Sequence, residues 1–139
     1  MILSPHEIAW LALNVGHWTP EEATVMTAIA LAESGGNTEA LGRSKDSASE
    51  SLGQRDHGLW QVSGRWFGGL MQVYRWRDPY DNARMARMVF DERARRLDHN
   101  GFGAWNVTIT GAELQFMPDA RWGVQAPWPP PPAQVGWRV

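Results

Sequence analysis

One stretch of the sequence decides the fold: TPEEATVMTAIALAESGGN, residues 19–37. It opens with Thr19, Pro20 and then Glu22, which is the pattern of a capping box with proline in the first helical turn. Small and apolar residues follow at helical spacing as far as the glycine pair 35–36, and such a pair ends a helix. The stretch therefore predicts a helix that carries Glu33 in its last turn.

The same start signal occurs twice more in the chain. SPHE, residues 4–7, predicts a helix that runs to about Asn14, with Gly16 just beyond its end. DPYD, residues 78–81, predicts a longer helix that closes at Asn100-Gly101. The apolar face of this longer helix is formed by Ala83, Ala86, Phe90, Ala94 and Leu97.

The segments between and after these helices have a different character. Residues 35–57 are rich in Gly, Ser, Asn and Asp, which predicts a long loop or a small irregular lobe. Residues 58–67, GLWQVSGRWF, are typical of a strand that enters a short helix. Helical periodicity fades from about Thr108, and four consecutive prolines at 129–132 predict an extended arm that reaches another surface.

We therefore expect a mainly α fold with a small irregular or β lobe, organised as a domain over residues 1–125 and a proline-rich arm over 126–139. A length of 139 residues fits one such domain. The net charge of −2 argues against nucleic acid as a partner. The chain has no cysteine and only four scattered histidines, so we expect neither a metal site nor a cofactor. The first ten residues carry no signal peptide pattern, and no apolar run is long enough to make a membrane a partner.

Glu33 is the first candidate for chemistry. Ile29 and Ala30 share its helix face, and the negative end of the helix dipole lies beside it. Both influences raise the pKa of a carboxyl group, and glycoside cleavage needs a protonated carboxylic acid near neutral pH. Position alone favours an ordinary exposed glutamate at a helix end.

A second carboxylate, Asp56, stands at the end of the polar segment, directly before His57. If the segment folds back, Asp56 faces Glu33 across a cleft, and two carboxylates in different environments can divide the acid and stabiliser roles. Asp56 read by itself is also consistent with a simple loop or strand-end cap.

Three segments, taken in order, resemble the motifs of the lysozyme superfamily. AESGGN (32–37) is similar to the "ESGxN" segment of soluble lytic transglycosylases, GLWQ (58–61) to their "GLMQ", and GAWN (103–106) to their "AYNAG". DHGLWQVSGRW (56–66) also looks like the "DYGILQINSRW" stretch of animal lysozymes. The resemblance covers about residues 20–107 and is strongest to bacteriophage lysozyme-like domains.

The resemblance implies roles for particular residues. Glu33 would be the general acid that switches to a base, and Asp56 would be the second catalytic carboxylate if the animal lysozyme pattern applies. Trp105 would pack against Glu33 and help raise its pKa, while Asn106 would bind substrate or cap local backbone. The residues implied in substrate binding are Gln61, Ser63, Trp66, Phe67, Trp105 and Asn106.

The implied function is cleavage of peptidoglycan between N-acetylmuramic acid and N-acetylglucosamine. Lysozymes use a second carboxylate and water, whereas lytic transglycosylases use one glutamate and form a 1,6-anhydro product, and both routes stay open. We expect a phage-encoded protein, either an endolysin-type factor for release or, as the arm favours, a component of the virion with a phage structural protein as a further partner through the arm. The alternatives are a structural component of a virion that keeps the lysozyme-like fold, and chitinase-type action.

Overall fold

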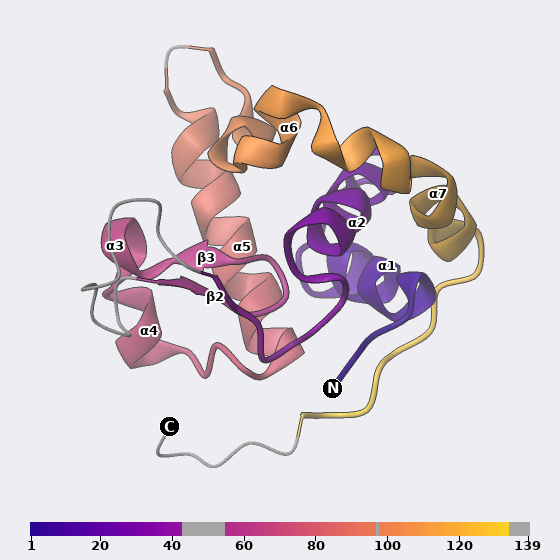
Figure 1. Cartoon of the computed structure of the whole chain (residues 1–139), viewed down its shortest axis with the longest axis horizontal. Helices are drawn as coiled ribbons and strands as arrows, with labels where there is room; N and C mark the ends of the chain where they lie inside the picture. The colour runs from indigo at the N-terminus through magenta and orange to yellow at the C-terminus, as the bar shows by residue number, and fades with distance from the viewer. Residues whose placement is uncertain (43–54, 97, 134–139) are drawn as a thin grey trace.

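A computed structural model describes residues 1–42, 55–96 and 98–133 (Figure 1). Leu97, the loop residues 43–54 and the arm residues 134–139, all included in the sequence predictions, lie outside the described residues. The α-helices are α1 (Pro5–Asn14), α2 (Pro20–Ser34), α3 (Gly64–Phe67), α4 (Leu70–Val73), α5 (Pro79–Ala94), α6 (Asn106–Thr110) and α7 (Met117–Gln125). The strands and 3-10 helices are β1 (Leu41–Gly42), β2 (Asp56–His57), β3 (Val62–Ser63), η2 (Gly101–Ala104) and η3 (Ala112–Phe116).

The predicted mainly α fold with a small β lobe is confirmed. Helices α1, α2 and α7 pack together on one side of the molecule, and the sheet with α3 and α4 lies on the other side of α5 (Figure 1). The buried core joins α1, α2 and α5 to the segment between β2 and β3, and Trp60 is its largest fully buried side chain. Among the described residues, no helix is both long and apolar enough to cross a membrane.

The first two helices begin and end where the sequence predicts. The Thr19 side chain accepts a hydrogen bond from the Glu22 N–H, and the Glu22 side chain accepts one from the Thr19 N–H. Ser4 and Glu7 form the same reciprocal pair at the start of α1. Helix α2 stops at Gly35, which has a left-handed backbone with φ of 63°. Local capping therefore fixes where Glu33 lies along α2.

The small lobe is a three-stranded antiparallel sheet in the order β1-β2-β3. Its register places Asp56 opposite both Gly42 of β1 and Ser63 of β3. The chain leaves β3 directly into α3, because the Ser63 hydroxyl accepts a hydrogen bond from the Trp66 N–H. The prediction of a strand that enters a short helix is confirmed.

The third predicted helix is shorter than expected. Helix α5 ends at Ala94 rather than near Asn100, so the predicted end was wrong. Arg95, Arg96 and the residues 98–100 are exposed, so a helix continued through them would bury none of these five side chains in return for their ordering. The Asn100 side chain instead caps the 3-10 helix η2.

The prediction that helical structure fades after Thr108 was also wrong. Helix α7 packs against α1 and α2. Its buried residues are the small Ala120 and Gly123, and a Cβ on Gly123 would lie 2.4 Å from the Pro5 carbonyl oxygen. This interface is a close backbone approach, so the periodic pattern of large apolar residues is missing there.

The described part of the proline-rich segment lies on its own domain. The Trp128 N–H donates to the His6 carbonyl at 3.3 Å, and the two rings stack with their centroids 4.0 Å apart. The Tyr80 hydroxyl, near the start of α5, donates to the Pro130 carbonyl at 2.6 Å. Figure 1 shows this segment running from α7 past α1. Over these residues, the surface that it reaches belongs to α1 and α5.

Candidate active site

Glu33 lies half-buried in the last turn of α2. Its pKa is raised from 4.5 to about 7, first because burial disfavours the charged carboxylate and second because the negative charge of Asp56 acts on it. The carboxyl group is therefore about half protonated at neutral pH. Such a group can donate a proton and take one back.

Asp56 is the first residue of β2 and reaches this site from the sheet. Its effect on the pKa of Glu33 means that the fold brings the two carboxyl groups near each other. One group lies at a helix end and the other on a strand, so two separate elements fix their spacing. Paired carboxyl groups in different surroundings can take different roles in one reaction.

Ser34 fastens the end of α2 to the sheet lobe. Its hydroxyl lies 2.7 Å from the Leu59 carbonyl oxygen, to which it donates, and it accepts the Gly36 N–H at 3.2 Å. Glu33 is the neighbouring residue, so this bond holds the acid-bearing turn against the segment that follows Asp56. The sequence pairs Glu33 with Ser34, but it does not reveal that Ser34 positions the site.

Asn82 of α5 is a fully buried residue that sequence reasoning missed. Its Oδ1 accepts the Trp60 N–H at 2.8 Å, and its Nδ2 donates to the carbonyl oxygens of His57 and Trp76 at 3.1 and 3.2 Å. A Cβ on Gly58 would lie 2.5 Å from that Nδ2, so the glycine leaves room for the bond. The signal in the sequence is a polar residue four positions before Ala86 on the buried face of the helix.

Trp60 and Trp105 continue this buried network. The Trp60 indole N–H donates to the Met26 carbonyl on α2 at 2.8 Å. The Trp105 indole N–H donates to the Trp60 carbonyl at 2.7 Å, and Trp105 is 3% exposed. The predicted contact of Trp105 with Glu33 stays a prediction, whereas its bond to Trp60 links the third motif to the second.

Gln61 braces the sheet lobe from inside. It is buried and has a left-handed backbone with φ of 49°. Its side-chain Nε2 donates to the carbonyl oxygens of Ala40 and Gly58, both at 2.9 Å. These two bonds tie Gln61 to the backbone on either side of β1 and β2, and its predicted contact with substrate stays a prediction.

The other predicted binding residues fall into two groups. Ser63 lies opposite Asp56 in the sheet register, and its hydroxyl caps α3. Asn106 is exposed at the start of α6. Trp66 and Phe67 of α3 line a groove of about 540 Å³, and neither carboxyl group is among the residues that line it. The two carboxyl groups therefore lie outside the lining of this groove.

Two further polar residues of the described chain are buried. His57 lies in β2 with its ring edge-on to Trp76 at 4.8 Å. Glu113 lies in η3. Within residues 1–42, 55–96 and 98–133, no three side chains of the His, Cys, Asp and Glu types gather as a metal site.

The site and the fold together define a class. A helical domain with a glutamate of raised pKa at a helix end, near an aspartate of a small sheet, has the paired carboxyl groups of enzymes that cleave glycosidic bonds. The family model described as a lysozyme-like domain matches residues 9–114, so the chain belongs to the lysozyme-like domain family. No curated protein and no solved structure matches the chain. At the level of the family, this membership indicates a glycosidase or lytic transglycosylase domain for peptidoglycan.

Proposed function

We propose that this protein cleaves the glycan strands of peptidoglycan between N-acetylmuramic acid and N-acetylglucosamine, with Glu33 as general acid and base. The observation that carries the proposal is the pKa of about 7 at Glu33, caused by burial and by Asp56. A general acid works best when its pKa lies near the working pH. The family match supplies the substrate class.

In the first step, protonated Glu33 donates its proton to the glycosidic oxygen as the bond from that oxygen to C1 of the muramic acid breaks. Positive charge develops at C1 and the ring oxygen, and the Asp56 carboxylate is the group that stabilises it. In the second step, the Glu33 carboxylate takes a proton from the attacking hydroxyl. That hydroxyl belongs either to water or to C6 of the same sugar.

Substrate binding in this proposal uses the residues around the two carboxyl groups. Trp66 and Phe67 offer aromatic faces for sugar rings, and Trp66 is 75% exposed. Ser63 and Asn106 offer polar groups at the edges of the site. Gln61 and Trp105 act indirectly, because their bonds go to backbone carbonyls that form the floor.

The test is clearing of purified cell walls, followed by turbidity. The native chain should clear them, and Glu33→Gln should abolish clearing because an amide cannot donate the proton. Glu21→Gln, at an exposed residue in the first turn of α2, is the matched control and should keep full activity. Equal clearing by native protein and Glu33→Gln would refute the assignment of Glu33.

Hydrolysis and transglycosylation give different products. Mass spectrometry of the released fragments should show reducing ends if water attacks and 1,6-anhydro ends if the C6 hydroxyl attacks. We propose hydrolysis, because Asp56 supplies the second carboxylate of that route. Anhydro ends together with full activity of Asp56→Asn would overturn this choice and leave the role of Glu33 intact.

We also propose that the protein acts from a phage virion, as a wall-cleaving component carried by the particle. The support is the resemblance of the AESGGN and GLWQ segments to phage lysozyme-like domains. Truncation after Ala133 keeps the contacts of Trp128 and Pro130 with the domain and removes only the last six residues, 134–139. If the native chain co-purifies with phage particles and the truncated chain does not, docking through those residues is supported. Unchanged incorporation of the truncated chain would refute it.

A further inference from the structure

The groove beside the carboxyl groups has a chemistry of its own. One wall is the apolar and aromatic surface of α3 and α4, where Trp66 lines the groove and stays largely exposed. The opposite wall is the end of α5 and the residues that follow it, together with Ala104 of η2. Its charged lining residues are Glu92, Arg93, Arg95 and Arg96.

The arginines on that wall outnumber the acidic side chains that pair with them. Arg93 forms a two-bond pair with Asp98, with the Nη2 to Oδ2 distance at 2.7 Å, and Arg95 pairs with Glu92. Across the part of the chain that the structure describes, Arg96 forms no ion pair, and its side chain is exposed. The groove therefore presents an available guanidinium in a protein whose net charge is −2.

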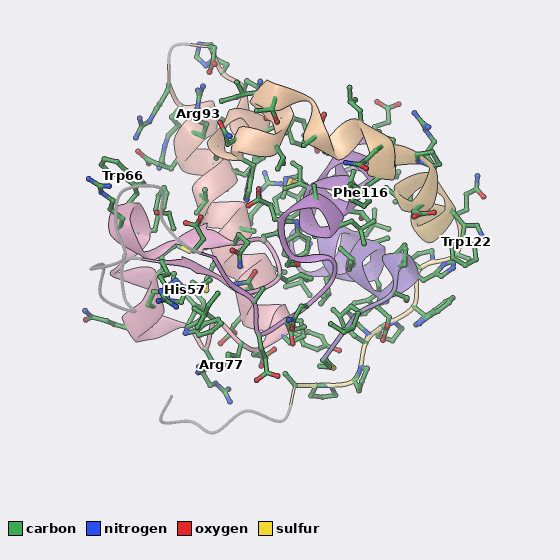
Figure 2. The ribbon with its side chains drawn as sticks, in the orientation of Figure 1. His57, Trp66, Arg77, Arg93, Phe116 and Trp122 are labelled. Carbon is green, nitrogen blue, oxygen red and sulfur yellow. The ribbon has the colours of Figure 1, made fainter. Side chains whose placement is uncertain are left out.

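The groove borders the candidate active site on two sides. At α3, the Trp66 N–H is bonded to Ser63, which lies opposite Asp56 in the sheet. At η2, Ala104 directly precedes Trp105, whose indole is bonded to the Trp60 carbonyl. Figure 2 shows Trp66 and Arg93 on the same side of the molecule, away from Phe116 and Trp122. A substrate at the carboxyl groups can extend into this groove.

We propose that the groove binds the acidic peptide stem of peptidoglycan, with the Arg96 guanidinium on a stem carboxylate and the glycan strand lying across Trp66. This inference rests on the proposed function. The backbone of the glycan is built of sugars that give a guanidinium no opposite charge, whereas the stem on each N-acetylmuramic acid carries free carboxylates. A guanidinium matches a carboxylate in charge and in its two-bond geometry.

The test measures binding without cleavage, in the Glu33→Gln background. The probes are sacculi free of teichoic acid, either intact or stripped of their stem carboxylates, which are converted to amides with carbodiimide and ammonia. Arg96→Gln should weaken binding to intact sacculi by roughly two- to fivefold, the effect of one exposed ion pair, and leave binding to stripped sacculi unchanged. Arg96→Lys should retain part of the affinity, and high salt should remove the difference between the variants.

Arg121→Gln is the matched control, because Arg121 is an exposed arginine on α7 and does not line the groove. It removes the same charge and should change neither measurement. Equal binding of Arg96→Gln and Arg121→Gln to intact sacculi would overturn the inference. A loss that is just as large on stripped sacculi would also overturn it, because the partner of Arg96 would then be the glycan.

The two proposals fail separately. The native chain could cleave stripped sacculi while Arg96→Gln has no effect on binding to intact sacculi. This result would refute the stem site and keep the glycan-cleaving function. Absence of cleavage of any wall, with the stem-dependent loss of binding still present in Arg96→Gln, would refute the cleaving function and keep the groove as a peptide-binding site.

Discussion

Two junctions hold this molecule together, and they are built in different ways. Where α2 and α5 meet the sheet lobe, polar side chains bond to backbone groups, as in the bonds of Ser34 to Leu59 and of Asn82 to Trp60. Where α1 meets α7, the helices approach closely at Gly123, and the His6 ring lies between Trp122 and Trp128. The first junction holds the two carboxyl groups, and the second holds none of the predicted site residues.

The difference matters because hydrogen bonds are directional and packing is not. A directional bond fixes where a backbone segment lies, and catalysis by two carboxyl groups depends on such placement. Close packing adds stability with a looser constraint on any one atom. Changes at the first junction should therefore reduce both stability and cleavage, whereas changes at the second should reduce stability alone.

The largest effect is expected for Asn82→Ala. It leaves the Trp60 N–H and the carbonyls of His57 and Trp76 buried without their partner, which costs about 3 kcal/mol of unfolding free energy. Denaturant unfolding measures this, and cleavage per folded molecule should fall as well. Asn14→Ala, which removes one exposed bond to the Trp10 carbonyl, is the control. A loss as small as that of the control would mean that Asn82 does not hold the lobe.

Gly123→Ala tests the second junction. Its Cβ would lie 2.4 Å from the Pro5 carbonyl oxygen, so α1 and α7 must move apart at a cost of about 2 kcal/mol. Cleavage per folded molecule should stay at the native level. Gly69→Ala meets no atom within 4 Å and should leave the unfolding free energy nearly unchanged. A loss of cleavage per folded molecule in Gly123→Ala would contradict the claim that the second junction affects stability alone.

Glu33 should make stability depend on pH. Its folded-state pKa of about 7 lies above the ordinary 4.5. The contribution of Glu33 to the unfolding free energy is therefore fully present below pH 4.5 and is lost as pH rises through 7. Glu33→Gln should therefore raise the unfolding free energy at pH 8 by about 1–2 kcal/mol, after allowance for solvent screening, and change it little at pH 4. Glu21→Gln should show no such gain. Equal stability of native protein and Glu33→Gln at pH 8 would contradict the idea that the charged Glu33 carboxylate destabilises the fold.

The smallest changes compare two hydroxyls that make similar bonds, one at the first junction and one where the proline-rich segment meets α5, away from the two carboxyl groups. Ser34 donates to Leu59 at 2.7 Å and Tyr80 donates to Pro130 at 2.6 Å. Ser34→Ala and Tyr80→Phe should each cost about 1 kcal/mol of unfolding free energy. Only Ser34→Ala should also lower the cleavage rate, by about tenfold, because it releases the turn that carries Glu33. Equal cleavage rates in the two variants would refute a positioning role for Ser34.

The parts that the sequence predicts well depend on local signals. The start of α2 at Thr19 and its end at Gly35 follow from residues a few positions apart. The strand that runs into α3 is marked by the alternation and aromatic content of residues 58–67. Such features need no knowledge of distant partners.

The parts that it missed depend on partners far along the chain. Asn82 bonds to groups of His57 and Trp60, 25 and 22 residues away, so its polar position on a buried helix face does not reveal which groups it bonds to. The sequence analysis did not predict helix α7, because the interface of this helix uses small residues in place of an apolar stripe. The second cause of the raised pKa, the charge of Asp56, needed only one assumption, that the polar segment folds back toward Glu33.

The proposed chemistry depends on a fold that raises the pKa of Glu33 to about 7. Its most direct test is a ¹³C NMR titration of the Glu33 carboxyl group in the folded protein. The account predicts a pKa of about 7, above the ordinary 4.5, with a lower value in Asp56→Asn because the repelling charge is gone. A Glu33 pKa near 4.5, unchanged by Asp56→Asn, would contradict it.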